Sequence, residues 1–380
     1  MNLTTQNILE ALSNVRYPGN GKSLLENGMV NPEEIIIEGV KISFPIHFEK
    51  STDPFIKSVI RMAESALESK LGKEVQVSGN LTPVYPSSVE KKDFPVLPGV
   101  KNIIGISSGK GGVGKSTVAA NIAIALASKG YKVGLLDADI FGPSMPKMFG
   151  VEDEPLYMER REGRDWIEPI EKYGVKMLSI GLLVAKENAV LWRGSMASNA
   201  LRQLITDAWW GELDYFLIDM PPGTSDIHLT LVQTLPITGV VIVTTPQQVA
   251  LADARKGIAM FREDKINVPV LGIVENMSWF TPASHPEEKY YIFGNGGGLK
   301  LAEEMGTKVL AQIPLVEGIC EGSDTGSPTS TRLRATSLTG SEDTCDAEAI
   351  AFALLGDAIV EECEERNHSL PPTRKVEVNK

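Results

Sequence analysis

Residues 109–116 read GKGGVGKS and match the pattern G-x-x-x-x-G-K-[ST], which decides how the rest of the chain is read. The pattern follows an apolar run, NIIGIS at residues 102–107, and opens a stretch with helical periodicity at residues 116–129. Glycines permit positive φ and let backbone N–H groups approach phosphate oxygens. Strand, loop and helix together therefore predict a phosphate-binding loop.

Two side chains of this loop carry the charge chemistry. Lys115 is expected to neutralise the β- and γ-phosphates of a nucleotide, and Ser116 to offer its hydroxyl to Mg²⁺. The N-terminus of the following helix adds partial positive charge. We therefore predict ATP and Mg²⁺ as cofactors, held by a loop that comprises Gly109, Lys110, Gly111, Gly112, Val113, Gly114, Lys115, Ser116 and Thr117. The alternative is a plain glycine-rich turn.

After the loop, short β-rich runs alternate with helical stretches. The β-rich runs lie at residues 131–137, 214–220, 239–245, 268–276 and 308–314. Strands that are apolar throughout and separated by helices indicate a parallel sheet that is buried on both faces. The expected fold class is α/β, with a doubly wound, mostly parallel sheet forming a P-loop NTPase domain over residues 100–365.

The first 80 residues have a different pattern. A helix around Ile8–Val15, a helix at about 55–71 and β-rich runs at 33–39, 40–46 and 74–79 predict a small α+β domain over residues 1–80. Prolines and a polar run at residues 90–93 predict a linker over residues 81–99. Residues 366–380 are expected to form a tail that frays from His368 onward.

The net charge, the cysteine count and the lack of a long apolar run exclude several classes of protein. The 380 residues include 49 acidic and 37 basic side chains, a net charge of −12, which argues against a nucleic-acid or anionic-membrane surface. Three cysteines near the end of the chain do not make a disulfide framework. With no leader pattern and no apolar run of about 18 residues, we expect a cytoplasmic protein.

Carboxylates follow two of the β-rich runs, at the sheet edge where open α/β folds bind ligands. LLDADIFGPS at residues 135–144 carries Asp137 and Asp139, which alternate and are expected on opposite faces of the strand. Asp139 is favoured as the functional carboxylate. For Asp137 a role beside the nucleotide and a role in turn formation both remain open.

DYFLIDMPPGTSD at residues 214–226 resembles a Walker B strand with a switch segment after it. Asp219 is expected at the end of the strand, where it can hold Mg²⁺, usually through water. The N–H of Gly223 is expected to be available to the γ-phosphate. Asp226 begins the next helix as an N-cap or acts in catalysis, and the two readings are equally favoured.

Lys110 is a second lysine inside the loop and marks the deviant Walker A motif. This motif resembles the family that contains MinD, ParA and the nitrogenase iron protein. The resemblance implies a homodimer in which Lys110 reaches the nucleotide of the partner subunit, where a cation stabilises the charge of phosphoryl transfer. It also implies that Asp139 lies near the attacking water and that Asn276 contacts adenine. A solvated loop lysine and a strand-end turn are the alternatives for Lys110 and Asn276.

Longer blocks make the resemblance more specific. DADIFGPSMP, LWRGSM, DYFLIDMPPGTSD and GIVENMS with IFGNGGG occur in this order and look like the Mrp (ApbC-like) iron–sulfur cluster carrier family. YPGNGKSLLENGMV, within the small domain, resembles the iron–sulfur assembly domain that often precedes this ATPase. The resemblance implies slow ATP hydrolysis coupled to cluster transfer, with apo iron–sulfur proteins or an assembly scaffold as partners.

The chain departs from that family at the cluster ligands. The family's C-x-x-C is missing from residues 279–291, WFTPASHPEEKYY, and the segment IHFEKSTDP of the small domain also lacks a cysteine. Cys320 is the one cysteine expected near the sheet edge and is our candidate ligand for a [4Fe–4S] cluster. His285 is either a further ligand or a solvated surface residue. Cys345 and Cys363 are interpreted as packing or surface thiols.

Two other function classes stay open. One is a positioning ATPase of the MinD or ParA kind, and the other is a nucleotide-switched scaffold with negligible turnover. The final helical stretch contains EECEERN, whose glutamates disfavour attachment to anionic lipid. The surroundings of Arg193 in LWRGSM are either a client-facing surface or ordinary surface structure.

Overall fold

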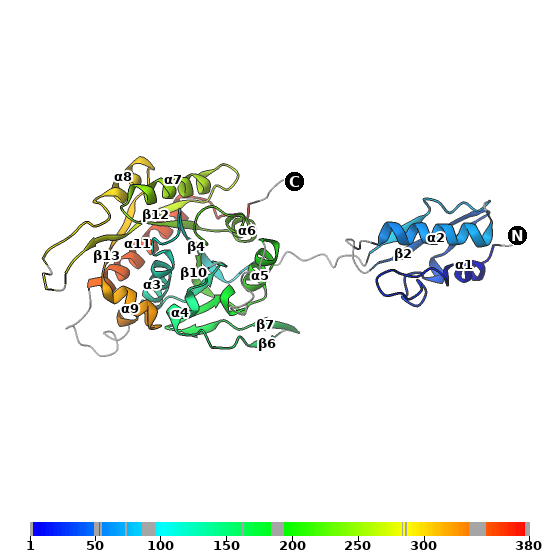
Figure 1. Cartoon of the computed structure of the whole chain (residues 1–380), viewed down its shortest axis with the longest axis horizontal. Coiled ribbons are helices and arrows are strands. Elements are labelled where there is room, and N and C mark those ends of the chain that lie inside the picture. The colour runs from blue at the N-terminus through cyan, green and yellow to red at the C-terminus, as the bar shows by residue number, and fades with distance from the viewer. Residues whose placement is uncertain are drawn as a thin grey trace. The chain divides into compact units, whose positions relative to one another are not determined.

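The computed structural model describes residues 3–48, 53, 55–72, 74–85, 96–140, 142–161, 163–183, 194–282, 284–285, 287–333 and 347–376. The chain divides into two compact units, Met1–Phe94 and Pro95–Lys380, and each is described by itself (Figure 1). Arg193 and Cys345 lie outside the described residues.

The first unit is a small sheet covered by two helices. Its elements are α1 (Thr5–Leu12), η1 (Pro32–Glu34), β1 (Ile36–Glu38), β2 (Lys41–His47), α2 (Ile56–Leu71) and β3 (Leu81–Val84). The strand order is β1-β2-β3, with β2 antiparallel to β1 and parallel to β3. Alternate residues of β2 are buried, and Phe44 packs in one core with Leu12 of α1 and Leu67 of α2. A small α+β unit is therefore present, as the sequence predicts.

Two details of this unit differ from the sequence prediction. Residues 81–84, expected in the linker, form the edge strand β3, where Pro83 is tolerated because a residue on an edge strand can do without a ladder N–H. The run at residues 74–79, expected as a strand, contributes a single bridge between Gln76 and Lys41 before the chain turns.

The second unit contains an eight-stranded sheet and a separate two-stranded hairpin. The strands of this unit are β4 (Val100–Ser108), β5 (Val133–Asp137), β6 (Met158–Arg161), β7 (Arg164–Ile167), β8 (Ile170–Lys172), β9 (Val175–Ser179), β10 (Leu213–Asp219), β11 (Gly239–Thr244), β12 (Val270–Phe280) and β13 (Val309–Leu315). The sheet order is β13-β12-β11-β4-β10-β5-β9-β8, and β6 and β7 form a separate hairpin. All neighbours in the sheet are parallel except β8 and β9.

Helices cover both faces of this sheet (Figure 1). They are α3 (Lys115–Ser128), α4 (Met145–Phe149), η2 (Ile180–Leu182), α5 (Gly194–Thr206), α6 (Asp226–Thr234), α7 (Gln248–Arg262), α8 (Gly297–Glu304), α9 (Glu317–Asp324) and α11 (Ala347–Ser369). One apolar core joins the sheet to α3, α4 and α11, and the other joins it to α5, α6, α7 and α8. The doubly wound, mostly parallel α/β sheet predicted from the sequence is confirmed.

The end of the chain is more ordered than the sequence prediction. Helix α11 continues to Ser369, beyond the boundary predicted at residue 365, and Arg366 is 8% exposed. After the helix, the hydroxyl of Thr373 donates to the carbonyl of Pro236, and the N–H of Val376 donates to the carbonyl of Val232. Residues 370–376 are thus bound to the end of α6 and to the residues after it by hydrogen bonds that periodicity does not reveal.

Candidate functional site

The phosphate-binding loop joins β4, near the centre of the sheet, to α3. Gly112 and Gly114 both have φ of +83°, a conformation that favours glycine. A Cβ on Gly114 would also lie 2.2 Å from Asn276 Nδ2, and a Cβ on Gly109 would lie 2.1 Å from the backbone carbon of Asp253 in α7. These glycines are therefore required by backbone angle and by close packing on β12 and α7.

A cavity of about 230 Å³ opens over the loop. It is lined by Ser108, Lys110, Gly111, Gly112, Gly114, Lys115, Ser116, Thr117, Asp139, Ser144, Met148 and Pro222. Most of the loop residues predicted to bind the nucleotide are in this lining, together with Asp139 from the segment after β5. Ser144 and Met148 are additions that the sequence reasoning missed, because helix α4 carries no phosphate-binding pattern.

Lys115 is the centre of the buried charge. Its side chain is 6% exposed, and its Nζ lies 2.5 Å from Asp219 Oδ1, 3.3 Å from the hydroxyl of Ser116 and 3.9 Å from Asp139 Oδ2. Burial raises the pKa of Asp219, and the ammonium of Lys115 and the hydroxyl of Ser116 offset part of that effect. The lysine thus compensates buried carboxylates at the position where a phosphate would lie.

The same carboxylate suits a magnesium site. Asp219 is fully buried, and its Oδ2 makes no hydrogen bond of ordinary geometry with the residues described. An unpartnered carboxylate oxygen beside a serine hydroxyl is a donor set that Mg²⁺ accepts, directly or through water. Ser116 and Asp219 therefore fit the ion predicted for them.

Asp137 has a structural environment. Its carboxylate accepts hydrogen bonds from the N–H groups of Asp139 and Met145, at 3.1 and 3.2 Å, and from the hydroxyl of Ser179 at 2.9 Å. Burial, and then the charge of Asp219, raises the pKa of Asp137 to about 7. These contacts favour a role for Asp137 in shaping the loop that carries Asp139.

The switch segment is closed onto the loop. We expected the N–H of Gly223 to be available to a phosphate. In this conformation it is not, because it donates to the carbonyl of Ser108 at 2.9 Å. The N-cap of α6 is Ser225, and Asp226 is the first helical residue, so the N-cap interpretation of Asp226 is wrong by one position.

Two other predicted residues lie beside the loop. Asn276 is 7% exposed, and its Nδ2 donates to the carbonyl of Val113 at 2.8 Å, so its amide supports the loop directly. Lys110 lines the cavity, and its ammonium makes no hydrogen bond or ion pair with the described part of the chain. Among these residues, Lys115 is held by internal partners and Lys110 is not.

Glu275 is a buried residue that the sequence reasoning missed. It is 1% exposed; its Oε2 accepts the N–H of Gly298 at 2.5 Å, and its Oε1 accepts from Gln312 Nε2 at 2.7 Å. A Cβ on Gly298 would lie 2.7 Å from the same carboxylate. The GIVENMS and IFGNGGG blocks are therefore joined where Glu275 meets the first turn of α8, a pairing that needs the fold to be seen.

The predicted cluster ligands are not gathered in a comparable way. Cys320 is exposed on α9, with its Sγ 3.8 Å from Asp324 Oδ2. Cys363 is buried on α11, and burial raises the pKa of its thiol to about 12, which is consistent with the packing role expected for it. In the described part of the chain, no hydrogen bond or ion pair connects Cys320 to His285.

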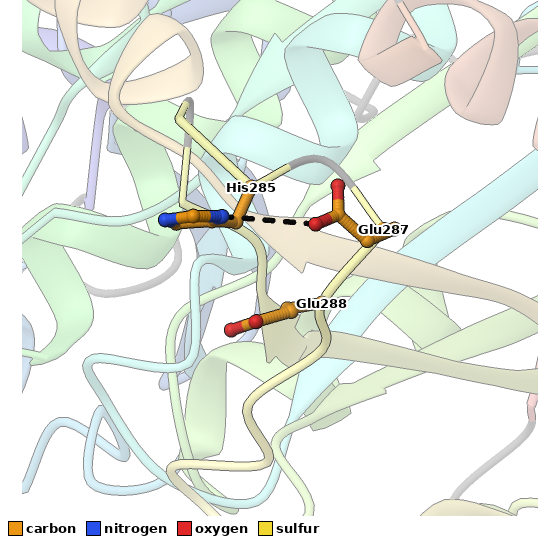
Figure 2. A group of neighbouring side chains, drawn as sticks. All are labelled: His285, Glu287 and Glu288. Carbon is orange, nitrogen blue, oxygen red and sulfur yellow. Dashed lines mark ion pairs between the residues drawn. The ribbon is translucent and has the colours of Figure 1, made fainter.

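His285 lies with Glu287 and Glu288 in the loop that lacks the cysteine pair (Figure 2). Their ligand atoms are all within 4.8 Å of one another, and His285 Nδ1 lies 3.7 Å from Glu287 Oε1. All three residues are exposed. The trio offers nitrogen and oxygen but no thiolate, whereas iron–sulfur clusters are held mainly by cysteine.

Comparison with known proteins places these sites in a family. A family model described as NUBPL iron-transfer P-loop NTPase matches residues 99–345, and one described as iron-sulfur cluster assembly protein matches residues 5–78. An iron-sulfur cluster carrier protein from Synechocystis sp. is 43% identical over 326 residues, which cover 86% of this chain and 91% of that protein. A protein of the same name from Pseudomonas fragi is 47% identical over 275 residues, covering 71% and 91% of the two chains.

A solved structure is also similar. It is a nucleotide-binding protein in complex with ADP from Archaeoglobus fulgidus, 38% identical, with a TM-score of 0.53 over 61% of this chain and 88% of that chain. Among the described residues, no helix is both long and apolar enough to cross a membrane. The loop, the sheet and the matched models agree, and the chain belongs to the NUBPL iron-transfer P-loop NTPase family.

Proposed function

We propose that this chain is an ATP-hydrolysing carrier that binds an iron–sulfur cluster and passes it to apo-proteins. The observation that carries the proposal is the buried contact of Lys115 with Asp219 at the phosphate cavity. Relatives named iron-sulfur cluster carrier proteins, which this chain matches along most of its length, supply the cargo.

The residues around the cavity suggest how hydrolysis proceeds. When a nucleotide enters, Lys115 exchanges its carboxylate partners for phosphate oxygens, and Asp219 and Ser116 are left to hold Mg²⁺, which supplies charge neutralisation when bound. Asp139, 3.9 Å from Lys115 Nζ, orients the attacking water. We expect slow turnover until a second copy supplies Lys110, which has no internal partner among the residues described.

We further propose that the protein is a cytoplasmic homodimer and that its partners are apo iron–sulfur proteins or an assembly scaffold. Phe352, Leu355 and Ile359 of α11 are buried in one core with α3. A positioning ATPase that docks on a membrane through its last helix needs the apolar face of that helix to be free. The packing of α11 therefore favours the carrier over the MinD-like alternative.

The cargo site differs from the usual family pattern. With no cysteine at residues 279–291, the exposed Cys320 is the thiolate that we assign to the cluster, and two copies supply two thiolates. His285 or a small-molecule thiol completes the set. Such a site binds a cluster weakly, which suits transient carriage rather than storage.

A transfer assay tests the function. The full chain is reconstituted anaerobically with iron and sulfide, separated from free ions and mixed with an apo [4Fe–4S] enzyme, and the recovered activity of that enzyme is followed with and without ATP. We expect activation that depends on the chain and changes with ATP in wild type but not in Lys115→Ala. Activation equal to that by free iron and sulfide would contradict the proposal.

A further inference from the structure

His228 is a buried polar residue that nucleotide binding leaves unexplained. It lies in the first turn of α6, is 1% exposed, and its ring meets Phe261 of α7 edge to face with centroids 6.1 Å apart. No acidic side chain pairs with it in the described part of the chain. A buried imidazole loses its hydration, so its position requires a structural reason.

The ring contacts one end of the switch segment, residues 221–225, where the segment enters α6. Its Nδ1 accepts the N–H of Ser225 at 3.1 Å and lies 3.2 Å from the Ser225 hydroxyl, forming a capping box in which histidine takes the usual place of glutamate or glutamine. The other nitrogen, Nε2, is buried without a hydrogen bond of ordinary geometry.

These contacts fix the protonation state. Burial, together with the charge of Lys115, lowers the pKa of His228 to about 4, so the ring is neutral near pH 7. Because Nδ1 accepts from Ser225, the one proton is on Nε2. The neutral ring thus accepts a hydrogen bond from the switch segment where that segment enters α6.

The switch segment, residues 221–225, borders the phosphate cavity. Pro222 lines the cavity, and Gly223, with φ of +76°, donates its N–H to the carbonyl of Ser108 at 2.9 Å. For Gly223 to reach a terminal phosphate, that hydrogen bond must break while the segment remains attached to β10 and α6. The ring of His228 is placed to keep the attachment point at Ser225 fixed.

We propose that His228 is a positioning residue for ATP hydrolysis: it anchors Ser225 at the start of α6 while Gly223, two residues earlier, transfers its N–H from Ser108 to the nucleotide. The inference rests on the proposed ATPase function. It separates binding from turnover, because the loop around Lys115 binds the phosphates whereas the switch segment acts as the γ-phosphate reacts. Loss of His228 should therefore lower kcat much more than it changes KM for ATP.

The test compares His228→Leu, which keeps the bulk but loses both polar contacts, with His228→Gln, whose amide restores the capping box. Two readouts are measured on the full chain: hydrogen–deuterium exchange of residues 223–228, and kcat and KM for ATP. In His228→Leu we expect about tenfold faster exchange in that segment, unchanged exchange in residues 248–262, and a loss in kcat of about tenfold with KM within about threefold. His228→Gln should stay near wild type in both.

The two readouts keep the inference distinct from the proposed function. A wild-type chain without turnover would overturn the ATPase, and the exchange measurement would then decide the role of His228 alone. Exchange in His228→Leu equal to wild type would overturn the inference. So would a His228→Gln chain that is as impaired as His228→Leu, because packing and not hydrogen bonding would then be responsible.

Discussion

The phosphate cavity and the loop at residues 279–291 both contain clusters of charged residues, but they hold them in opposite ways. At the cavity, the side chains of Lys115 and Asp219 are 6% and 0% exposed and are 2.5 Å apart. In the loop, the side chains of His285 and Glu287 are 58% and 70% exposed and 3.7 Å apart. A buried charge needs a specific partner, whereas a solvated charge does not. The nucleotide site is therefore strongly constrained, and the loop at residues 279–291 is not.

The largest expected effect is the loss of ATP affinity in Lys115→Ala at the nucleotide site. The ammonium offsets charge on two phosphates in a buried site, so its loss should weaken ATP binding by at least about 100-fold, or about 2.7 kcal/mol. Calorimetry measures the affinity. Lys110→Ala is the matched control, a lysine of the same loop without an internal partner, and its affinity should stay within about threefold of wild type. Equal affinities in wild type and Lys115→Ala would refute the placement.

Lys110 and Asp139 test whether the site is shared between two copies. Each single alanine variant should bind ATP but hydrolyse it at least about tenfold more slowly. In a one-to-one mixture, about half of the dimers are hybrids, and each hybrid has one site with both groups intact if Lys110 acts on the partner's nucleotide. About a quarter of wild-type ATPase activity should then return. No recovery in verified hybrids would mean that Lys110 acts within its own subunit or not at all.

The pH dependence of the free energy of unfolding tests the burial of His228. Its pKa of about 4 in the folded chain is below the value of about 6.5 expected when unfolded, so the unfolded chain binds the extra proton between these values. Stability due to this residue is present above pH 6.5 and is lost as pH falls toward 4, with about 2 kcal/mol lost at pH 5.

Urea unfolding at pH 7 and pH 5 measures this difference. All five tryptophans lie in the second unit, so their fluorescence reports its unfolding. The decrease in unfolding free energy from pH 7 to pH 5 should be smaller in His228→Gln than in wild type. Asp137, whose raised pKa acts in the opposite direction, is present in both chains and cancels in the comparison. Identical pH dependence would contradict the burial of a neutral ring.

His285→Ala tests the exposed loop at residues 279–291 and should have the smallest effect on stability and ATP binding. The exposed ion pair with Glu287 contributes little, so the free energy of unfolding should change by less than about 0.5 kcal/mol. ATP affinity should equal that of wild type. A loss of more than about 1 kcal/mol would show that the loop is held by contacts that exposure does not reveal.

The same contrast explains what could be predicted from the sequence. The alternation of strands and helices, the loop at residues 109–116 and the placement of Asp219 at a strand end follow from periodicity and spacing, which are local signals. The side chains that depend on distant partners were missed or left open. Asp137 contacts Ser179, Glu275 contacts Gly298, and His228 contacts Ser225 at the end of the switch segment.

Two errors also have a non-local cause. Pro83 suggested a linker, but an edge strand accepts proline, and only the pairing with β2 shows that residues 81–84 are at an edge. The tail is predicted to fray because it is the end of the chain. Its hydrogen bonds are instead to Val232 in α6 and to Pro236 just after that helix, more than 130 residues earlier in the chain.

We infer that this chain has a built nucleotide site and an incomplete cargo site. One anaerobic preparation, reconstituted with iron and sulfide, tests both halves: ATP binding is measured by calorimetry, and iron, sulfide and visible absorption are measured in wild type and in three Cys→Ser variants. We predict full ATP occupancy with a weak cluster signal that Cys320→Ser abolishes and that Cys345→Ser and Cys363→Ser leave unchanged. A stable, stoichiometric cluster that survives Cys320→Ser would contradict the account.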